Sequence, residues 1–309
     1  MTDDPERTAS LMTPARLAQM KPKPQASSAA WLDQMATGAG DSHVGRLREL
    51  AAQLGQQAQS RDCGALASAL AKFDEALPQL DFDLLQPKGW LARATGKART
   101  AGVEFAGQFD RIVQAARTLR DEVQRFASRQ HAEAAAMERM LVEFEVEWRG
   151  IEKILDQGAR WLQDMRNQLK TRQAEAGTDA EALAKIKEDT ARCEMLVDRL
   201  KMLRGVSTAA QQVHQHGHAA LARYATLSQT AQQLATQQWK VWEGRLSAIA
   251  SSAGEGGPAL NLEEPREAHR DLGRRVQQAI ADCAQLTEQD AAFARQLGAF
   301  GEELKNASS

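Results

Sequence analysis

Residues 137–169 read MERMLVEFEVEWRGIEKILDQGARWLQDMRNQL. Large apolar side chains recur in this stretch at alternating steps of four and three residues, which places them along one face of an α-helix. Such a face is typical of the seam of a coiled coil. The stretch therefore predicts a long helix that buries one side against other helices. Its seam residues are Met137, Leu141, Phe144, Trp148, Ile151, Leu155, Leu162, Met165 and Leu169.

The helix around this seam can extend far in both directions, because no proline occurs between Pro87 and Pro258. We expect a first long helix over 101–175, a stop at Gly177 and a second long helix that ends near residue 250. Short turns between long helices make them antiparallel neighbours.

A third helix is expected after a linker rich in Ser and Gly over residues 251–258, which ends in Pro258. Asn261 can cap its first turn, and its apolar series continues to Leu304 with one polar residue, Asp290. We therefore predict an all-α fold, an elongated antiparallel three-helix coiled-coil bundle over residues 100–309.

Two shorter helices are expected upstream of the bundle. Apolar residues at helical spacing between residues 44 and 77 predict two helices, split near Arg61 and stopped by Pro78. The predicted organisation is a flexible tail over 1–43, short helices and a connector over 44–99, and the bundle. The third helix is too short to cover residues 134–213, so we expect this arm to be covered by the N-terminal helices or by another protein.

Composition narrows the class of protein. The 309 residues are 43% hydrophobic and 26% charged, enough for a real core. Lys and Arg (39) nearly balance Asp and Glu (41), so nothing global indicates a nucleic-acid partner. Three distant cysteines argue against disulfides and zinc knuckles. No apolar run could span a membrane and the acidic N-terminus has no secretory signal, so we expect a cytoplasmic protein.

Several landmarks lie between residues 80 and 250, among them the connector over 80–88, the triplet Phe109-Asp110-Arg111 and single residues from Arg199 to Trp242. Together they resemble the TelA family of toxic-anion (tellurite) resistance proteins, which are long helical bundles of the bacterial cytoplasm. The connector Leu80-Asp81-Phe82-Asp83-Leu84-Leu85-Gln86-Pro87-Lys88 resembles the family's Leu-Asp-x-Leu-Thr-Pro-Lys region, and Phe109-Asp110-Arg111 resembles the start of its long helix. Further matches fit the family spacing: Arg199, Leu203, Ala210, Gln212, Leu227 and Trp242.

The chain also departs from that family. Where TelA-like sequences carry Pro-Gln-Ile-Arg followed by Gln and Asn residues, this chain reads His214-Gln215-His216-Gly217-His218-Ala219. Trp239-Lys240-Val241-Trp242 replaces the family's Ile-Pro-Leu-Trp. The resemblance therefore implies a divergent member that has kept the scaffold and changed the task.

The same histidines form the one concentrated group of metal-ligand type. Positions i and i+4 share a helix face, so His214 and His218 could both reach one metal ion, while His216 points away. His131 could approach as a third ligand if the arm folds at Gly177. The alternative is a solvated stretch of helix surface, which fits the absence of any Glu-x-x-His pattern.

Tryptophans are the strongest candidates for partner contacts. Trp239 and Trp242, three residues apart, fit core packing first and a partner-binding hot spot second. Trp148 and Trp161 lie on the expected arm, and Trp31 lies on a short amphipathic turn within the tail, which could dock onto a partner or back onto the bundle.

Charged clusters offer two further candidates. Lys88, Arg93, Lys97 and Arg99 form a basic segment that could touch anionic lipid or phosphate, although such cations are more often solvated. Glu143 and Glu147 share a helix face, where acid–base work would need a cleft. No nucleophile, nucleotide-binding or phosphate-binding motif is present, so we expect neither an enzyme nor a cofactor.

The sequence thus predicts a non-enzymatic helical-bundle protein that contributes to toxic-anion or envelope-stress resistance by binding other proteins. Two alternatives stay open: a metal- or oxyanion-binding resistance protein that uses His214 and His218, and an architectural coiled-coil scaffold without a stress role. Protein partners are expected, with a homo-oligomer and peripheral membrane contact as further alternatives and no nucleic acid.

Overall fold

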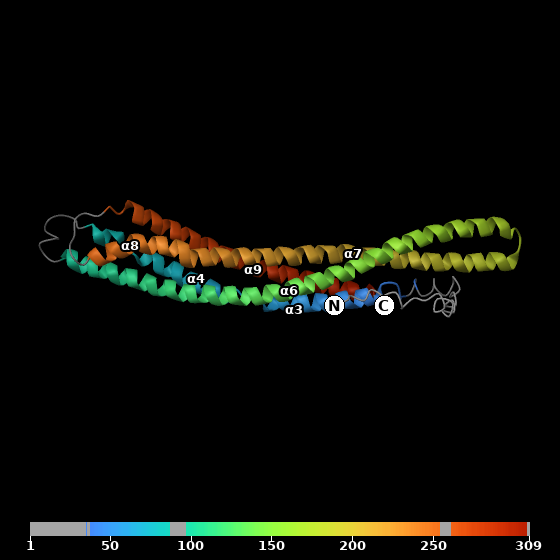
Figure 1. The fold of residues 1–309 in the computed structure, drawn as a ribbon, viewed down its shortest axis with the longest axis horizontal. Coiled ribbons are helices and arrows are strands. Elements are labelled where there is room, and N and C mark those ends of the chain that lie inside the picture. The colour runs from blue at the N-terminus through green and yellow to red at the C-terminus, as the bar shows by residue number, and fades with distance from the viewer. Residues whose placement is uncertain (1–34, 36–37, 87–96, 254–260, 308–309) are drawn as a thin grey trace, which may run out of the picture. The chain divides into compact units, whose positions relative to one another are not determined.

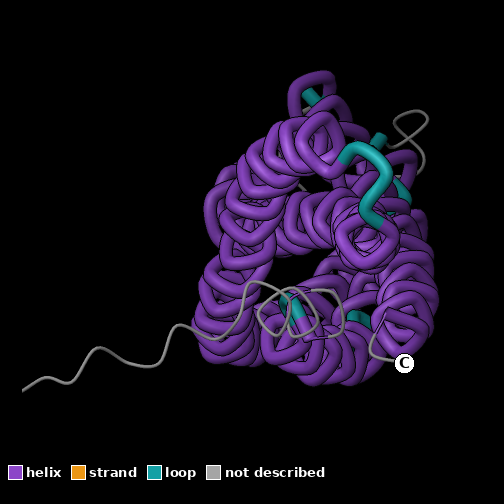
Figure 2. The backbone as a smooth tube through the Cα atoms, turned by 90° about the vertical axis from the view of Figure 1, so that its right-hand side faces the viewer, coloured by secondary structure: helices purple, strands orange, loops and turns teal. Residues whose placement is uncertain are grey.

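The computed structural model describes residue 35 and residues 38–86, 97–253 and 261–307. Every regular element within these residues is a helix, as Figures 1 and 2 show, so the all-α prediction is confirmed. Long proline-free stretches rich in Ala, Gln, Glu and Leu have high helix propensity, which explains this outcome. None of the helices in the described ranges is both long and apolar enough to cross a membrane.

The two short helices expected near the N-terminus are present. Helix α3 spans Asp41–Ser60 and helix α4 spans Gly64–Ala76. Two 3₁₀ turns follow, η3 (Leu77–Gln79) and η4 (Phe82–Leu85). Pro78 lies in η3, where it ends the α-helical hydrogen bonding as its missing N–H predicts.

The two long helices also follow the predicted outline. Helix α6 spans Lys97–Ala176 and helix α7 spans Ala180–Gln233. Gly177 connects them with a φ of 52°, a left-handed conformation that glycine adopts without strain. The carboxylate of Asp179 accepts hydrogen bonds from the backbone N–H groups of Glu181 (3.0 Å) and Ala182 (3.4 Å), which caps α7.

The predicted continuous helix to residue 250 is wrong in one respect. After α7 the chain forms a π-helical turn, η5 (Leu234–Gln238), before helix α8 (Trp239–Ala253). Leu234 and Trp239 are both buried and lie five residues apart, a step that matches the wider π turn better than an α-helix. Helix α9 spans Glu263–Ala307, and Asn261 caps its start as predicted.

The described residues group into two compact units, each assembled from separate stretches of chain. We name residues 150–207, with the described residues up to 42, the hairpin unit, and residues 43–149 with 208–307 the core unit. These boundaries differ from the sequence-based segments 1–43, 44–99 and 100–309, because α6 and α7 each contribute residues to both units.

The core unit has one large apolar core, to which α4, α6, α7, α8 and α9 contribute side chains. Helix α9 supplies a regular buried series, so the seam that the sequence predicts for this helix is present. The buried residues of the series are Leu272, Val276, Ala279, Cys283, Leu286, Asp290, Phe293, Leu297, Phe300 and Leu304.

The hairpin unit has a thinner apolar interior, a single seam between the end of α6 and the start of α7. Residues 39–41, just before and at the start of α3, are tied to α7 because Arg199 donates to the carbonyl of Ala39 (3.0 Å) and pairs with Asp41. The buried seam residues are Ile151, Leu162, Met165, Leu169, Ile186, Cys193, Leu196, Leu200 and Leu203.

Candidate functional site

Two histidines of α7 lie together in the core unit. The Nε2 atoms of His214 and His218 are 3.2 Å apart, as the i, i+4 spacing predicts. His216 is directed elsewhere, since its Nδ1 lies 2.5 Å from Oε1 of Gln296 on α9. His131 is exposed on α6. Nowhere in the described ranges do three or more His, Cys, Asp or Glu side chains gather closely enough to hold a metal ion.

Helix α6 supplies the surroundings of this pair. Oε2 of Glu145 lies 3.8 Å from Nε2 of His214, and Arg149 reaches the other oxygen of Glu145 at 3.6 Å. The Arg149 guanidinium also covers the Trp148 ring at 4.2 Å. Burial and, secondly, His218 lower the pKa of His214, with Glu145 opposing them. His214 is therefore a neutral imidazole near pH 7, the form that binds metals.

A close helix contact holds α7 against α6 at this point. A Cβ atom on Gly217 would lie only 2.6 Å from Cδ2 of Leu141, closer than such atoms approach. Gly217 therefore marks a tight approach of the two helices.

The acidic run on α6 is used for ion pairs with α3. Glu147 contacts Nδ1 of His43 at 2.7 Å, and Glu143 pairs with Arg46 at 2.6 Å. Glu143 and Glu147 thus share a face, as expected, and each has its own cationic or imidazole partner. This arrangement positions α3 on α6.

The tryptophans at the start of α8 lie inside the core. Trp239 is 3% exposed and Trp242 is 1% exposed. Trp242 stacks on Phe109 at 5.6 Å, and its indole nitrogen donates to Nδ1 of His269 at 3.2 Å. Their helical spacing is accounted for by core packing, the first of the two interpretations that the sequence allows.

The remaining tryptophans differ from one another. Trp148 is buried, and its indole N–H has no hydrogen-bond partner among the described residues. Trp161 is half-buried in the hairpin unit. Trp31 lies outside the described residues, as do Lys88 and Arg93 of the predicted basic segment. Lys97 and Arg99 belong to the first turn of α6, and the structure does not describe their side chains.

A groove in the hairpin unit is a candidate that the sequence reading missed. It has a volume of about 230 Å³ between α6 and α7. Five apolar side chains and three cationic ones line it, and no acidic residue does. The lining residues are Leu155, Ala159, Leu162, Arg166, Val197, Leu200, Lys201 and Arg204. We name this surface the hairpin groove.

Gly158 is the feature of the sequence that could have indicated the hairpin groove. It occupies a seam position between Leu155 and Leu162, where every other step of the series carries a large side chain. A Cβ atom there would lie 2.8 Å from both methyl carbons of Leu200, so the helices meet closely at this point. Predicting the hollow beside it required knowing which residues of α7 lie opposite, and the sequence does not fix that register.

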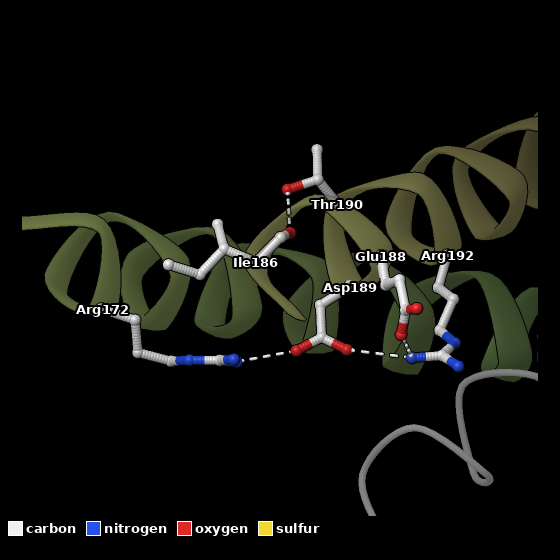
Figure 3. A network of polar contacts seen from close by, with 6 residues as sticks. All are labelled: Arg172, Ile186, Glu188, Asp189, Thr190 and Arg192. Atoms are coloured by element: carbon white, nitrogen blue, oxygen red, sulfur yellow. Dashed lines mark hydrogen bonds and ion pairs between the residues drawn. The ribbon is translucent and has the colours of Figure 1, made fainter. Parts of the chain in front are cut away.

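An ion network joins the two helices of the hairpin unit (Figure 3). Asp189 on α7 accepts from Arg172 on α6 at 2.7 Å and from Arg192 at 3.2 Å. Glu188 adds a longer contact to Arg192, at 3.8 Å. Both Asp189 oxygens thus accept from arginines, one from each of the two helices.

A second polar cluster lies within the core unit. The Tyr224 hydroxyl donates to Asp290 at 2.5 Å, and the Cys63 thiol lies 3.7 Å from the same hydroxyl. Arg61 places its guanidinium 4.8 Å from the centre of the Tyr224 ring, and two of its buried nitrogens lack hydrogen-bond partners among the described residues. Burial raises the pKa of Tyr224, Cys63 and Asp290. The cluster is closed to solvent, so we assign it to structure.

Comparisons with known proteins do not add a family. No protein-family model matches the chain. Searches of curated proteins and of solved structures also return no match. The TelA resemblance therefore stays a prediction from the residues quoted above.

Proposed function

We propose that this protein is not an enzyme and acts by binding other proteins, with the hairpin groove as the docking surface for an acidic amphipathic segment of a partner. The observation that carries the proposal is the composition of that groove, an apolar floor lined by three cations, of which Lys201 also pairs with Asp198 of its own helix at 2.9 Å. An occupant that buries apolar side chains and carries carboxylates would satisfy both features.

The geometry supports this choice over a small-molecule site. A drug-sized ligand pocket has a volume of roughly 300–1,000 Å³ and buries most of its ligand. The hairpin groove is smaller, at about 230 Å³, and lies on the surface of a two-helix unit. Such a groove suits the side chains on one face of a docked helix better than an enclosed substrate.

We also propose a finer fold and a cellular setting. The regular buried series of α9, and the matching series on α6 and α7, support an antiparallel three-helix coiled-coil bundle. The resemblance to TelA supports a cytoplasmic role in toxic-anion or envelope-stress resistance. That role rests on the resemblance alone, whereas the docking proposal rests on the groove.

The docking proposal is tested with a charge-reversed groove. The tagged chain is purified from its own host with and without tellurite, and a variant with Arg166→Glu and Lys201→Glu is purified in parallel. The control is Lys170→Glu with Lys187→Glu, which changes the net charge equally at exposed lysines of the same unit. Bound proteins are identified by mass spectrometry after cross-linking.

We expect a partner that binds wild type and control but not the groove variant, with cross-links from an acidic segment to the groove. A partner retained by the groove variant would overturn the proposal, and so would capture of only a second copy of this chain, which favours the architectural alternative. The resistance role is tested separately by growth on tellurite after deletion of the gene. Normal growth would remove that role and leave the docking result standing.

A further inference from the structure

We propose that His214 and His218 form a binding site for a divalent transition-metal ion such as Zn²⁺ or Ni²⁺, held between their Nε2 atoms. Imidazole is a preferred ligand of these ions, whereas Mg²⁺ and Ca²⁺ prefer oxygen. This inference is independent of the hairpin groove, which lies in the other unit.

The distance between the two nitrogens fits metal coordination. Zn²⁺ binds histidine nitrogen at about 2.0–2.1 Å, so two such ligands at a tetrahedral angle stand about 3.3 Å apart. The observed separation of the Nε2 atoms is 3.2 Å. The two nitrogens therefore stand at the spacing of a chelating pair, and the proton that one Nε2 directs at the other must move to Nδ1 before both can bind an ion.

Glu145 is the donor best placed to join them. Its Oε2 lies 3.8 Å from Nε2 of His214. In a tetrahedral zinc site a carboxylate oxygen and a nitrogen stand about 3.3 Å apart, so the carboxylate must move toward α7 before it can become a third ligand. In this assignment the two histidines alone form the site before an ion binds. Once an ion is bound, Glu145 is its third ligand and water takes the fourth position.

Arg149 competes with the ion for Glu145. Its guanidinium lies 3.6 Å from Oε1 of Glu145 and carries a charge that repels a metal ion. Binding would draw the carboxylate toward α7 and loosen this pair. Because Glu145 belongs to α6 and the histidines belong to α7, a bound ion would link the two helices beside the Gly217 contact.

The first experiment measures binding of Zn²⁺ and of Ni²⁺, each alone, to the full untagged chain by isothermal titration. We expect one ion per wild-type chain, and loss of that binding in His214→Ala and in His218→Ala. His216→Ala and His131→Ala are the matched controls, since His216 is exposed on the same helix and faces Gln296. Both controls should bind as the wild type does.

Melting temperature gives a second readout. An ion that binds only the folded chain raises the melting temperature, and Mg²⁺ should leave it unchanged. Absence of zinc and nickel binding in the wild type would overturn the proposal. Binding that persists in both histidine variants would also overturn it, because the ion would then occupy another site.

Two further variants test the third ligand. Glu145→Gln keeps the side-chain shape and removes the charge, and we expect the dissociation constant to rise on the order of 10-fold. Arg149→Gln removes the competitor and should tighten binding. If Glu145→Gln binds as tightly as the wild type, Glu145 is not a ligand, and that part of the assignment fails. Circular dichroism without metal checks that each variant remains folded.

Discussion

Asp189 of the hairpin unit and Asp290 of the core unit each bring a carboxylate into a contact between helices, but their surroundings differ. Asp189 lies at the edge of a thin seam and is held by two arginines that water can still reach. Asp290 is 5% exposed and accepts from a tyrosine hydroxyl inside a broad core. In the thin interior of the hairpin unit, a carboxylate between helices is stabilised by ion pairs that water can reach. In the broad core of the core unit, a carboxylate between helices is stabilised by a buried hydrogen bond.

The strongest way to break this comparison is Asp290→Ala. The substitution leaves the Tyr224 hydroxyl without its acceptor and removes an acid from the neighbourhood of the buried Arg61. Leaving a buried hydrogen-bonding group without its partner costs roughly 1–3 kcal/mol, so we expect the free energy of unfolding to fall by up to about 3 kcal/mol. Urea denaturation measures it.

Glu288→Ala is the matched control, because Glu288 is exposed two residues earlier on the same helix. It should change the free energy of unfolding by less than about 0.5 kcal/mol. A loss below about 1 kcal/mol for Asp290→Ala would mean that the cluster rearranges, and the contrast with Asp189 would then disappear.

Alanine substitutions at two glycines compare how tightly the helices pack in the two units. Gly217→Ala places a methyl group against Leu141 in the core unit, and Gly158→Ala places one against Leu200 in the hairpin unit. Overpacking costs about 1–3 kcal/mol and alanine returns up to about 1 kcal/mol of helix propensity. We expect a net loss of about 1 kcal/mol for Gly217→Ala and little change for Gly158→Ala, where the hairpin groove leaves Leu200 room to move.

Gly205→Ala is the control for both, because nothing lies within 4 Å of the added atom. It should raise the free energy of unfolding by up to about 1 kcal/mol. Equal losses for Gly217→Ala and Gly158→Ala would show that the two units are packed alike. Thermal unfolding followed by circular dichroism is sufficient for this series.

Asp189→Asn should have a smaller effect than Asp290→Ala. The variant loses its ion pairs with Arg172 and Arg192, but the arginines remain hydrated, and partly exposed pairs contribute less than about 1 kcal/mol. The loss should shrink further at 1 M salt, whereas that of Asp290→Ala should not. A salt-independent loss would show that Asp189 behaves as a buried group.

The smallest expected effect is the pH dependence of stability that arises from His214. Burial and His218 lower the pKa of His214, while Glu145 raises it and Arg149 lowers it. The folded chain therefore binds this proton less tightly than the unfolded chain, and stability should fall as the pH drops below about 6.5. His214→Gln should flatten that part of the profile in a chelator-containing buffer. An unchanged slope would contradict the lowered pKa.

Periodicity was enough to predict most of the fold. The steps of four and three residues around Phe144 and along α9 predicted the helices and their buried faces, because burial selects apolar residues on one side. Pro78 and Gly177 marked their ends for steric reasons. The π turn was missed, although the step of five from Leu234 to Trp239 was visible in the sequence.

The candidate sites were less predictable, because they depend on which helices lie side by side. The i, i+4 rule brings His214 to His218 within one helix, and the structure has this pair. The sequence of a single helix does not show that Glu145 of α6 lies beside His214 of α7. It also does not show that Val197 and Leu200 line the same groove as Leu155. Such pairings depend on the register between helices, and one sequence leaves that register open.

The three thiols give the molecule built-in reporters of its own motion. Cys193 lies in the hairpin unit, and Cys63 and Cys283 lie in the core unit, all buried and unpaired with one another. Burial raises the pKa of each, that of Cys283 to about 12, so a thiol reagent reacts only after local opening. The labelling rate at Cys193 therefore measures how often the hairpin unit opens locally. The labelling rates at Cys63 and Cys283 measure the same for the core unit, and all three can be followed in one chain without substitutions.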